Sequence, residues 1–553
     1  MKERRRNGYE QREADRNMRR REERRHMTAR DRRRARREEK RRAKRKRARN
    51  KEFARVTYVF VTLFLVMMGY ISYFNVVKSK DFISSPYNRR SDTLAKRVTR
   101  GKILDKRGKV LAQTTTSADG SETREYPYGR EFAHVVGYTA KGKYGLESRM
   151  NSELLSSNAF FLEKLTNEFQ DKKNPGDNVV TTLDVKLQRA AYDALGDRKG
   201  AVVAMDPKTG KVLAMVSKPD FNPETVEDKW QTLNTDSSAR LLNRATQGQY
   251  PPGSTFKVIT ALEYIREHGN PDDYSYVCQG QIEAGSNTIH CFGGKVHGQV
   301  SFRDSLAYSC NTSFSNIGQG LKIPDFKKTT KKLLFDSKLP GNISYKESHF
   351  ALSDQAGIAE RMMTAIGQGK TQVSPYHMAL ITSAIANGGT LMKPYLVDSV
   401  TNYKGAVISS TKPEKYAELM TAKEASMLKD YMSSVTKYGT AASAMSGTSY
   451  TTAGKTGTAE YSSDKNKDHS WFIGMSNVDD PDLVVSVVIE AADGNAKAVN
   501  VARKVLMPII KERGRHMHIY KYLYVPEGLQ KKKKILLKKP EKTGNLFTPG
   551  GFN

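Results

Sequence analysis

Cysteine is scarce in this sequence, with three in 553 residues. That number is too small for a scaffold held together by a disulfide framework. The sequence also lacks the C-x-x-C and H-E-x-x-H spacings that are typical of zinc sites, so we expect no metal and no cofactor. Internal repeats with a period of about 20–50 residues are absent as well, which excludes solenoid and propeller architectures.

Acidic residues are few relative to basic ones: 59 Asp and Glu face 93 Lys and Arg, which gives a net charge of +34. Residues 1–55 hold 27 basic and 10 acidic side chains, and residues 511–553 hold 11 and 3. Because most of the excess lies in these two segments, the rest of the chain has an ordinary surface charge. We therefore expect no nucleic-acid partner.

Long apolar runs are limited to one. Residues 56–77 read VTYVFVTLFLVMMGYISYFNVV, 22 residues without a charge, and a helix of that length crosses a hydrocarbon core of about 30 Å. The run is longer than a secretory h-region, and Lys78-Ser79-Lys80 stands where a cleavage site would be. It predicts an uncleaved anchor that crosses the cell membrane once, with the basic N-terminus in the cytoplasm and all later residues outside.

The anchor and the changes in composition divide the chain into five predicted parts. Residues 1–55 are predicted to be a disordered basic tail, because an Arg-rich segment with few apolar residues cannot fold alone. Residues 56–77 are the anchor, and residues 78–178, with strand-like fragments and Gly-rich turns, form a short β-rich pedestal. Residues 179–512 form the main domain, and residues 513–553 are a second disordered basic tail.

The main domain mixes helix and strand patterns. Apolar runs predict strands at 201–205, 212–216, 470–475 and 483–489. The first two flank the turn Asp206-Pro207-Lys208-Thr209-Gly210, a pattern typical of a β-hairpin. Helical periods are found at 187–195 and 496–510. The mixture predicts an α+β fold, with helices packed on an antiparallel sheet.

Ser254 and Lys257 form an S-x-x-K motif directly after Tyr250-Pro251-Pro252-Gly253. The Pro-Pro-Gly breaker is followed by a helical period, so Ser254 is predicted to open a helix with Lys257 on the same face. A buried lysine can lose its proton and serve as the base that activates a serine hydroxyl. The helix N-terminus favours negative charge where an oxyanion would form.

The S-x-x-K spacing also occurs at Ser409–Lys412 and at Ser434–Lys437. The first of these copies lies in a polar segment that contains Pro413, and the second has no helix breaker in front of it. Ser254 alone opens a helical pattern after a rigid turn, so it is the predicted nucleophile.

Two further motifs follow. In Ser309-Cys310-Asn311, a serine and an asparagine two residues apart on a short loop can face one cleft, although a turn or a helix cap explains the same residues equally well. In Lys455-Thr456-Gly457-Thr458, the lysine and two hydroxyls suit a carboxylate, and the glycine lets a substrate backbone approach closely.

The three motifs, in this order, resemble those of the penicillin-binding protein transpeptidases, a family of acyl-transfer enzymes. The resemblance runs from about residue 80 to residue 512 and includes stretches beyond the motifs. These stretches are Arg100–Asp105, Leu183–Gln188, Asp206–Gly210, Tyr250–Lys257, Ile366–Gly369, Ala384–Gly389 and Gly454–Glu460.

The resemblance implies a role for each catalytic residue. Ser254 would attack the carbonyl between the two terminal D-alanines of a peptidoglycan stem peptide, and Lys257 would take its proton. Ser309 would pass a proton to the leaving amine. A β-lactam would mimic this donor peptide and acylate Ser254.

The resemblance also implies a substrate-binding set. Asn311 would hold the amide of the donor peptide, and Lys455, Thr456 and Thr458, with Gly457 between them, would bind its terminal carboxylate. The backbone N–H groups of Ser254 and Thr458 would form the oxyanion hole.

Residues 78–178 are too few for the glycosyltransferase domain of bifunctional members, so the resemblance implies a monofunctional class B protein. Its pedestal would be dimerisation-like, and residues 179–512 would be the transpeptidase domain. The implied partners are stem peptides, β-lactams and a SEDS-type glycosyltransferase in the membrane. A D,D-carboxypeptidase of the same superfamily and a non-catalytic scaffold of a cell-wall synthesis complex are the alternatives.

The cysteines and histidines have no part in this mechanism. Cys278 and Cys291 lie 13 positions apart and either form a disulfide or stay as free thiols. Cys310 is predicted to be a small buried apolar residue. No catalytic role is expected for His290, His297 or His469.

Overall fold

The computed structural model describes residues 14–19, 21–22, 28–74, 94–448, 450–460, 468–492 and 497–507. The chain divides into two units, Met1–Ser85 and Pro86–Asn553. The last three residues of the predicted anchor, the end of the predicted helix 496–510 and the predicted tail 513–553 lie outside the described residues.

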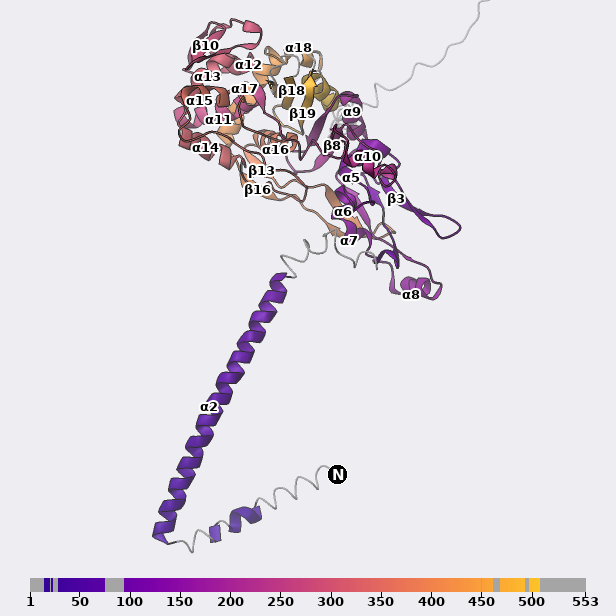
Figure 1. Cartoon of the computed structure of the whole chain (residues 1–553), viewed down its shortest axis with the longest axis vertical. Helices are drawn as coiled ribbons and strands as arrows, with labels where there is room; N and C mark the ends of the chain where they lie inside the picture. The colour runs from indigo at the N-terminus through magenta and orange to yellow at the C-terminus, as the bar shows by residue number, and fades with distance from the viewer. Residues whose placement is uncertain are drawn as a thin grey trace, which may run out of the picture. The chain divides into compact units, whose positions relative to one another are not determined.

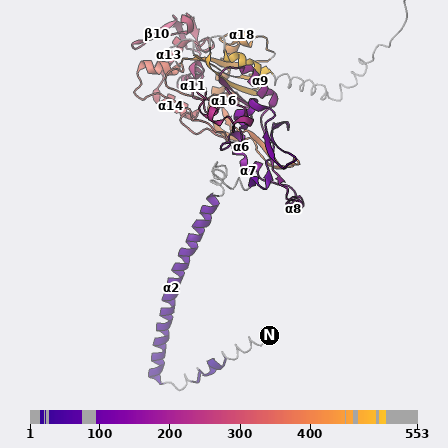
Figure 2. The same cartoon turned by 45° about the vertical axis from the view of Figure 1, so that its right-hand side comes forward.

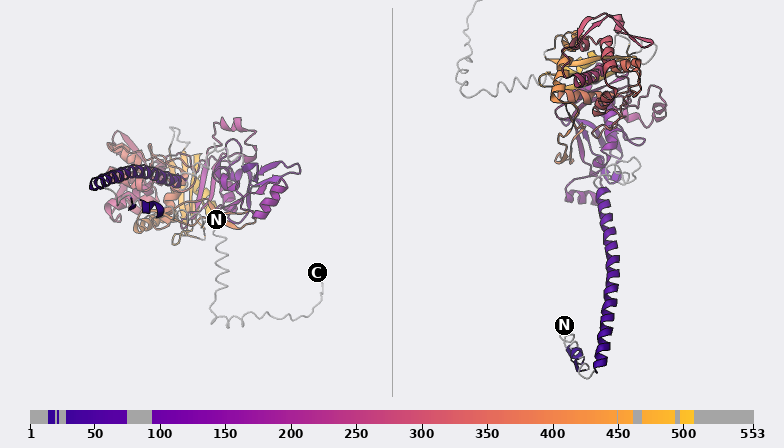
Figure 3. Two further views of the ribbon diagram at one scale, coloured as in Figure 1. Left: turned by 90° about the horizontal axis from the view of Figure 1, so that it is seen from below. Right: turned by 90° about the vertical axis from the view of Figure 1, so that its left-hand side faces the viewer.

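The first unit contains one long helix, α2 (Ala29–Tyr73), of 45 residues (Figures 1 and 3). Its part Phe53–Tyr73 is long and apolar enough to cross a membrane, in agreement with the predicted anchor. The helix begins much earlier than the apolar run, however, so residues 29–52 are helical where the composition predicted disorder. Arg, Lys, Glu and Ala are strong helix formers, and a helix that extends an existing one needs no new nucleus.

The second unit is built around a five-stranded antiparallel sheet in the order β17-β18-β19-β7-β8. Its strands are β7 (Gly200–Met205), β8 (Val212–Lys218), β17 (Thr452–Ala459), β18 (Asp468–Ser476) and β19 (Leu483–Ala492). The hairpin β7–β8 joins the three late strands through β19, with Val203 opposite Ser486. The predicted hairpin and the α+β fold are thereby confirmed, and β17 is left at an edge of the sheet.

Helices flank this sheet (Figure 1). The helix α16 (Pro375–Ala386) contacts β7, β18 and β19 and is buried along its whole length. Its own side chains are mostly small or apolar on every face, so that no face needs water. Residues 498–507 form a further helix, within the closing helix predicted from the sequence. The other helices are α9 (Val185–Leu195), α10 (Trp230–Asn234), α11 (Lys257–His268), α12 (Phe302–Ala307), α13 (Asn311–Gly320), α14 (Ile323–Lys332), α15 (Ile358–Ala365), α17 (Ala422–Lys437) and α18 (Ala442–Met445).

Three two-stranded sheets lie among these helices. They pair β9 (Ser275–Cys278) with β12 (Gly298–Ser301), β10 (Gln281–Ala284) with β11 (Asn287–His290), and β13 (Thr390–Met392) with β16 (Lys415–Glu418). Short 3-10 turns are η3 (Pro223–Thr225), η4 (Gly253–Phe256) and η5 (Phe292–Gly294).

A six-stranded sheet in the order β15-β14-β6-β2-β3-β4 forms the pedestal. Its strands are β2 (Ile103–Leu104), β3 (Val110–Thr116), β4 (Glu122–Glu125), β6 (Asn178–Thr181), β14 (Val397–Thr401) and β15 (Val407–Ser410). The smaller elements beside it are β1 (Val98–Thr99), β5 (Asn174–Pro175), η2 (Gly129–Phe132), α5 (Ala133–Val136), α6 (Gly145–Arg149), α7 (Asn151–Leu154) and α8 (Phe161–Phe169). Because β14 pairs with β6, residues 397–410 of the predicted main domain complete the pedestal sheet. Figures 1 and 2 show α8 and β10 at opposite ends of this unit.

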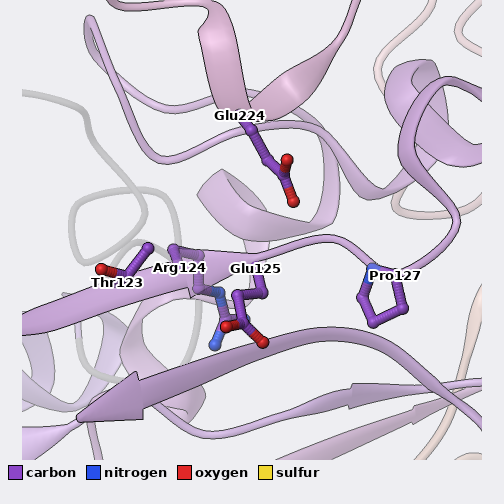
Figure 4. A pocket seen from close by; sticks show the side chains of 5 residues that line it. All are labelled: Thr123, Arg124, Glu125, Pro127 and Glu224. Carbon is purple, nitrogen blue, oxygen red and sulfur yellow. The ribbon is translucent and has the colours of Figure 1, made fainter. Parts of the chain in front are cut away.

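The pedestal carries a hollow of about 530 Å³ between β4 and η3 (Figure 4). It is lined by Thr123, Arg124, Glu125, Pro127 and Glu224. The backbone N–H of Tyr126 donates to Glu224 Oε1 at 3.0 Å and so ties the two elements together. None of the predicted site residues lines this hollow.

A buried carboxylate, Glu147, holds the pedestal together. Arg100 Nε donates to its Oε2 at 2.6 Å, and Arg124 Nε donates to its Oε1 at 2.7 Å. The Glu147 side chain is fully buried. Burial raises the pKa of Glu147, but the two guanidinium groups outweigh this and hold it below its ordinary value. The carboxylate is therefore ionised at neutral pH and compensates two buried positive charges.

We expect Glu147→Gln to destabilise the second unit by about 3–5 kcal/mol, because it leaves two nearly buried guanidinium groups without a counter-charge. Urea unfolding of the full-length protein in detergent would measure the change. Glu414→Gln is the matched control, since its pair with Lys393 is exposed on both sides and is worth about 0–1 kcal/mol. Equal midpoints for the two variants would show that Glu147 has no such role.

Candidate active site

The turn that carries Ser254 is short and sharply bent. Gly253 has a φ of 52° and begins the 3-10 turn η4, and the α-helix α11 begins only at Lys257. The prediction that Ser254 opens the α-helix is therefore wrong by one turn, because residues 253–256 form a 3-10 turn ahead of the α-helix. Ser254 is half-buried, whereas Thr255 beside it is buried, so the serine faces an open side of the turn.

Backbone contacts from distant segments fix this turn. The N–H of Gly253 donates to Gly367 O at 2.9 Å, and Trp471 Nε1 donates to Pro251 O at 3.1 Å. A Cβ atom on Gly367 would lie 1.9 Å from Gly253 O, and one on Gly253 would lie 2.3 Å from Thr458 O. Only glycine fits at positions 253 and 367, so the turn is held close against strand β17.

Lys257 is completely buried and connects the first motif to the second. Its Nζ donates to Ser309 O at 2.7 Å, to Ser309 Oγ at 3.2 Å and to Asn311 Oδ1 at 2.6 Å. Burial lowers the pKa of Lys257 to about 7. A large fraction of this amine is therefore unprotonated at neutral pH and can accept a proton.

The second motif lies where a loop enters helix α13. Ser309 has a φ of 56°, which is uncommon outside glycine, and Cys310 is the N-cap of α13. Asn311 is the first residue of the helix, and its Nδ2 donates to the backbone oxygen of His290 at 2.9 Å. Both ends of the Asn311 amide are thus held, since Lys257 binds the oxygen.

The third motif lies on the edge strand β17. Thr456 and Thr458 are half-buried, and Lys455 is fully buried with its Nζ donating to Thr456 O at 3.0 Å. A Cβ atom on Gly457 would lie 3.0 Å from Thr255 Cγ2, so the strand touches the turn that carries Ser254. Burial lowers the pKa of Lys455 well below its ordinary value, and the nearby positive charge of Lys257 lowers it further.

The three predicted motifs therefore converge on one place. The two lysines are buried, whereas five motif side chains are half-buried and open to a substrate: Ser254, Ser309, Asn311, Thr456 and Thr458. Ser254 stands three residues before a buried amine of lowered pKa, and its turn packs against a strand with threonine hydroxyls, an arrangement that suits acyl transfer to and from the serine. The competing copies do not resemble this arrangement, since Ser409 lies on the exposed strand β15 and Ser434 is buried in α17.

One contact residue was missed by the sequence analysis. Thr440, in the turn after α17, places its Oγ1 2.6 Å from Thr456 Oγ1. No motif surrounds it, and it reaches β17 only through the fold. The packing roles of Trp471 and Gly367 were likewise not visible, because each acts on a segment more than a hundred residues away.

Comparison with protein families matches residues 200–511 to the penicillin binding protein transpeptidase domain and residues 100–179 to the penicillin binding protein A dimerisation domain. The peptidoglycan D,D-transpeptidase PbpA of Mycolicibacterium smegmatis is 30% identical over 493 residues, which cover 84% of this chain and 99% of that protein. The peptidoglycan D,D-transpeptidase MrdA of Acinetobacter baumannii is 26% identical, covering 69% of this chain and 65% of that protein.

Solved structures of the same kind are similar. The D,D-transpeptidase domain of a peptidoglycan glycosyltransferase from Eggerthella lenta has a TM-score of 0.68 and 31% identity, covering 76% of this chain and 99% of that one. The penicillin G acyl-enzyme complex of penicillin-binding protein A from M. tuberculosis has a TM-score of 0.66 and 30% identity, covering 74% and 98%.

Proposed function

Because this chain belongs to the penicillin-binding protein transpeptidase family and is a class B peptidoglycan D,D-transpeptidase, we propose that Ser254 is its acylated nucleophile and Lys257 its base. The enzyme cross-links stem peptides through a serine acyl-enzyme, releases the terminal D-alanine, and is a target of β-lactams. The observation that carries the assignment is the buried Lys257, whose lowered pKa and contacts with Ser309 and Asn311 join two motifs.

In the first half-reaction, Ser254 Oγ attacks the carbonyl carbon of the penultimate D-alanine while Lys257 Nζ accepts the hydroxyl proton. The N–H groups of Ser254 and Thr458 stabilise the oxyanion. Ser309 Oγ, 3.2 Å from Lys257 Nζ, passes the proton to the departing nitrogen, and the C–N bond breaks to release D-alanine. An acceptor amine then attacks the Ser254 ester and restores the hydroxyl.

The donor peptide binds along β17. This strand pairs with β18 on one side and lies at the edge of the five-stranded sheet, so an extended peptide can add to its other side. Asn311 holds the peptide's amide, and Lys455, Thr456 and Thr458 bind its terminal carboxylate. A bound carboxylate would raise the pKa of Lys455 again, because it opposes the burial and the positive charge of Lys257 that lower it.

The rate constant for acylation by a β-lactam is expected to rise with pH and level off above about 7. The base works only when neutral, and the pKa of Lys257 is lowered to about 7, so the active fraction falls as pH drops. For one titrating group, the rate at pH 5.5 would be about 30-fold lower than at pH 8. Stopped-flow measurement with a β-lactam that does not titrate in this range tests the proposal. A rate that is flat down to pH 5.5, in a protein shown to stay folded there, would contradict it.

We also propose that α2 places the residues before Phe53 in the cytoplasm and the catalytic unit outside the membrane. The support is the basic sequence that precedes the apolar part of α2. The apolar part would contact a SEDS-type glycosyltransferase that supplies glycan strands. A photo-crosslinking residue at Phe60 or Leu65 tests both points in intact cells, because it should capture a polytopic membrane protein while external protease still removes the catalytic unit.

A further inference from the structure

Three buried cysteines and one histidine gather directly behind the second motif. Cys278 ends β9, Cys291 follows β11, and Cys310 is the N-cap of α13. All three side chains are buried and unbridged, and they form a small cluster of the core apart from the main one. With His297, which precedes β12, their ligand atoms all lie within 4.8 Å of one another.

Three of the distances in this cluster match those of a tetrahedral metal site. Cys278 Sγ and Cys310 Sγ each lie 3.7 Å from Cys291 Sγ, and His297 Nδ1 lies 3.4 Å from Cys278 Sγ. Zinc takes sulfur at about 2.3 Å and nitrogen at about 2.0–2.1 Å in tetrahedral sites, which separates two sulfurs by about 3.8 Å and sulfur from nitrogen by about 3.5 Å. A disulfide between two of the cysteines would not explain why the third thiol and the histidine lie in the same cluster.

Hydrogen-bond donors surround the sulfur atoms as they do around metal thiolates. The N–H of Gly280 points to Cys278 Sγ at 3.4 Å, and the N–H of Ser313 points to Cys310 Sγ at 3.5 Å. Thr312 Oγ1 lies 3.3 Å from Cys310 Sγ. Such groups stabilise the deprotonated ligand and fix its direction. The His297 ring is held parallel to the ring of Tyr308 at 6.0 Å between centroids.

We propose that Cys278, Cys291, His297 and Cys310 bind one zinc ion in a closed structural site. Binding converts three thiols to thiolates and releases three protons, so the ion and its ligands carry one net negative charge. Four protein ligands leave no position for water, and the ion itself takes no part in the reaction. The sequence predicts no metal because 12, 5 and 12 residues separate the ligands, a spacing that no short motif describes.

The site would position the loop that carries Ser309 and Asn311, the catalytic loop. This argument rests on the proposed function. Cys310 stands between Ser309 and Asn311, the two residues that contact Lys257. Ser309 has a left-handed backbone, so the loop needs support to keep that conformation. Zinc would tie Cys310 to β9 and to the segments after β11 and before β12, and would thus hold the loop in place from behind.

Metal content tests the site without any β-lactam. The full-length protein, purified in detergent without chelator, is expected to hold about one zinc per chain by mass spectrometry. Cys278→Ser and His297→Gln should lose most of it, whereas His290→Gln should retain it, because His290 is an exposed histidine nearby that lies outside the cluster. A wild-type protein with substoichiometric zinc that takes up none after dialysis against zinc would overturn the proposal.

Thiol chemistry distinguishes zinc from a disulfide. In denaturant, the zinc form should yield three reactive thiols together with the released metal. One thiol and no metal would identify a disulfide and overturn the site. If the cysteine variants fail to fold, cobalt exchanged into the wild-type protein should give the strong visible absorption of tetrahedral cobalt thiolate, and its absence would count against the proposal.

The effect on the catalytic loop is measured separately. Zinc removal with a chelator should lower the rate of β-lactam acylation roughly 10- to 100-fold, and zinc should restore it, while the adduct remains on Ser254. An unchanged rate in the zinc-free protein would overturn the positioning role. A failure of Ser254 to be acylated would refute the proposed function but leave the metal content as it was.

Discussion

Ser254→Ala is expected to abolish covalent labelling by a fluorescent β-lactam, read on a denaturing gel beside the wild type. The serine oxygen is the atom that becomes the ester, so its removal leaves nothing to acylate. The side chain is half-buried, and removal of one oxygen should leave the fold intact. A thermal unfolding curve close to that of the wild type would establish that the loss is chemical.

The chain supplies its own controls for this experiment. Ser409→Ala and Ser434→Ala alter two further S-x-x-K copies and should label like the wild type, because one serine lies on an exposed strand and the other inside a helix. Labelling that survives in Ser254→Ala and disappears in either control would move the nucleophile and refute the assignment.

Lys257→Met is expected to lower the acylation rate constant by about 10³-fold while leaving the nucleophile in place. Methionine has nearly the length of lysine and tolerates complete burial, so the cavity stays filled. The acceptors on Ser309 and Asn311 lose a donor, at a cost of about 1–3 kcal/mol that a melting curve will report. Stopped-flow acylation with excess β-lactam measures the rate.

The lysines of the same two copies are again the controls. Lys412 and Lys437 are exposed, and their replacement by methionine should leave the rate within about twofold. The residual activity of Lys257→Met should also lose the acid limb near pH 7. A variant that keeps both the wild-type rate and that limb would exclude Lys257 as the base.

Much of the fold was predictable because its signals are local. The hairpin β7–β8 follows from two apolar runs around Asp206–Gly210, and the membrane anchor follows from one uncharged run. The early start of α2 was not predicted, because an Arg-rich composition indicates disorder when it stands alone but not when an apolar helix continues it. The strands β14 and β15 join the pedestal sheet because β14 pairs with β6, which lies far away in the sequence. No local pattern predicts such a pairing.

The residues of the site also differ in how far the sequence alone predicted them. The motif residues were recognisable because each motif is short and the turn before Ser254 has a strong breaker. Thr440 and the cysteine–histidine cluster were not, because the spacings that bring their atoms together match no recognisable short motif. The sequence predicted that Lys257 could lose its proton if it were buried. The structure shows that it is buried, and burial is what lowers its pKa.

The contact between Gly253, Gly367 and Thr458 also limits how this enzyme can change under antibiotic selection. A side chain at either glycine would push the turn that carries Ser254 away from β17, so we expect such a variant to lose transpeptidation together with β-lactam acylation. Resistant variants that keep activity are therefore expected to retain both glycines and to alter side chains at the rim of the site, such as the exposed Thr440. The two glycine codons are, for the same reason, expected to stay unchanged in strains that have been exposed to β-lactams.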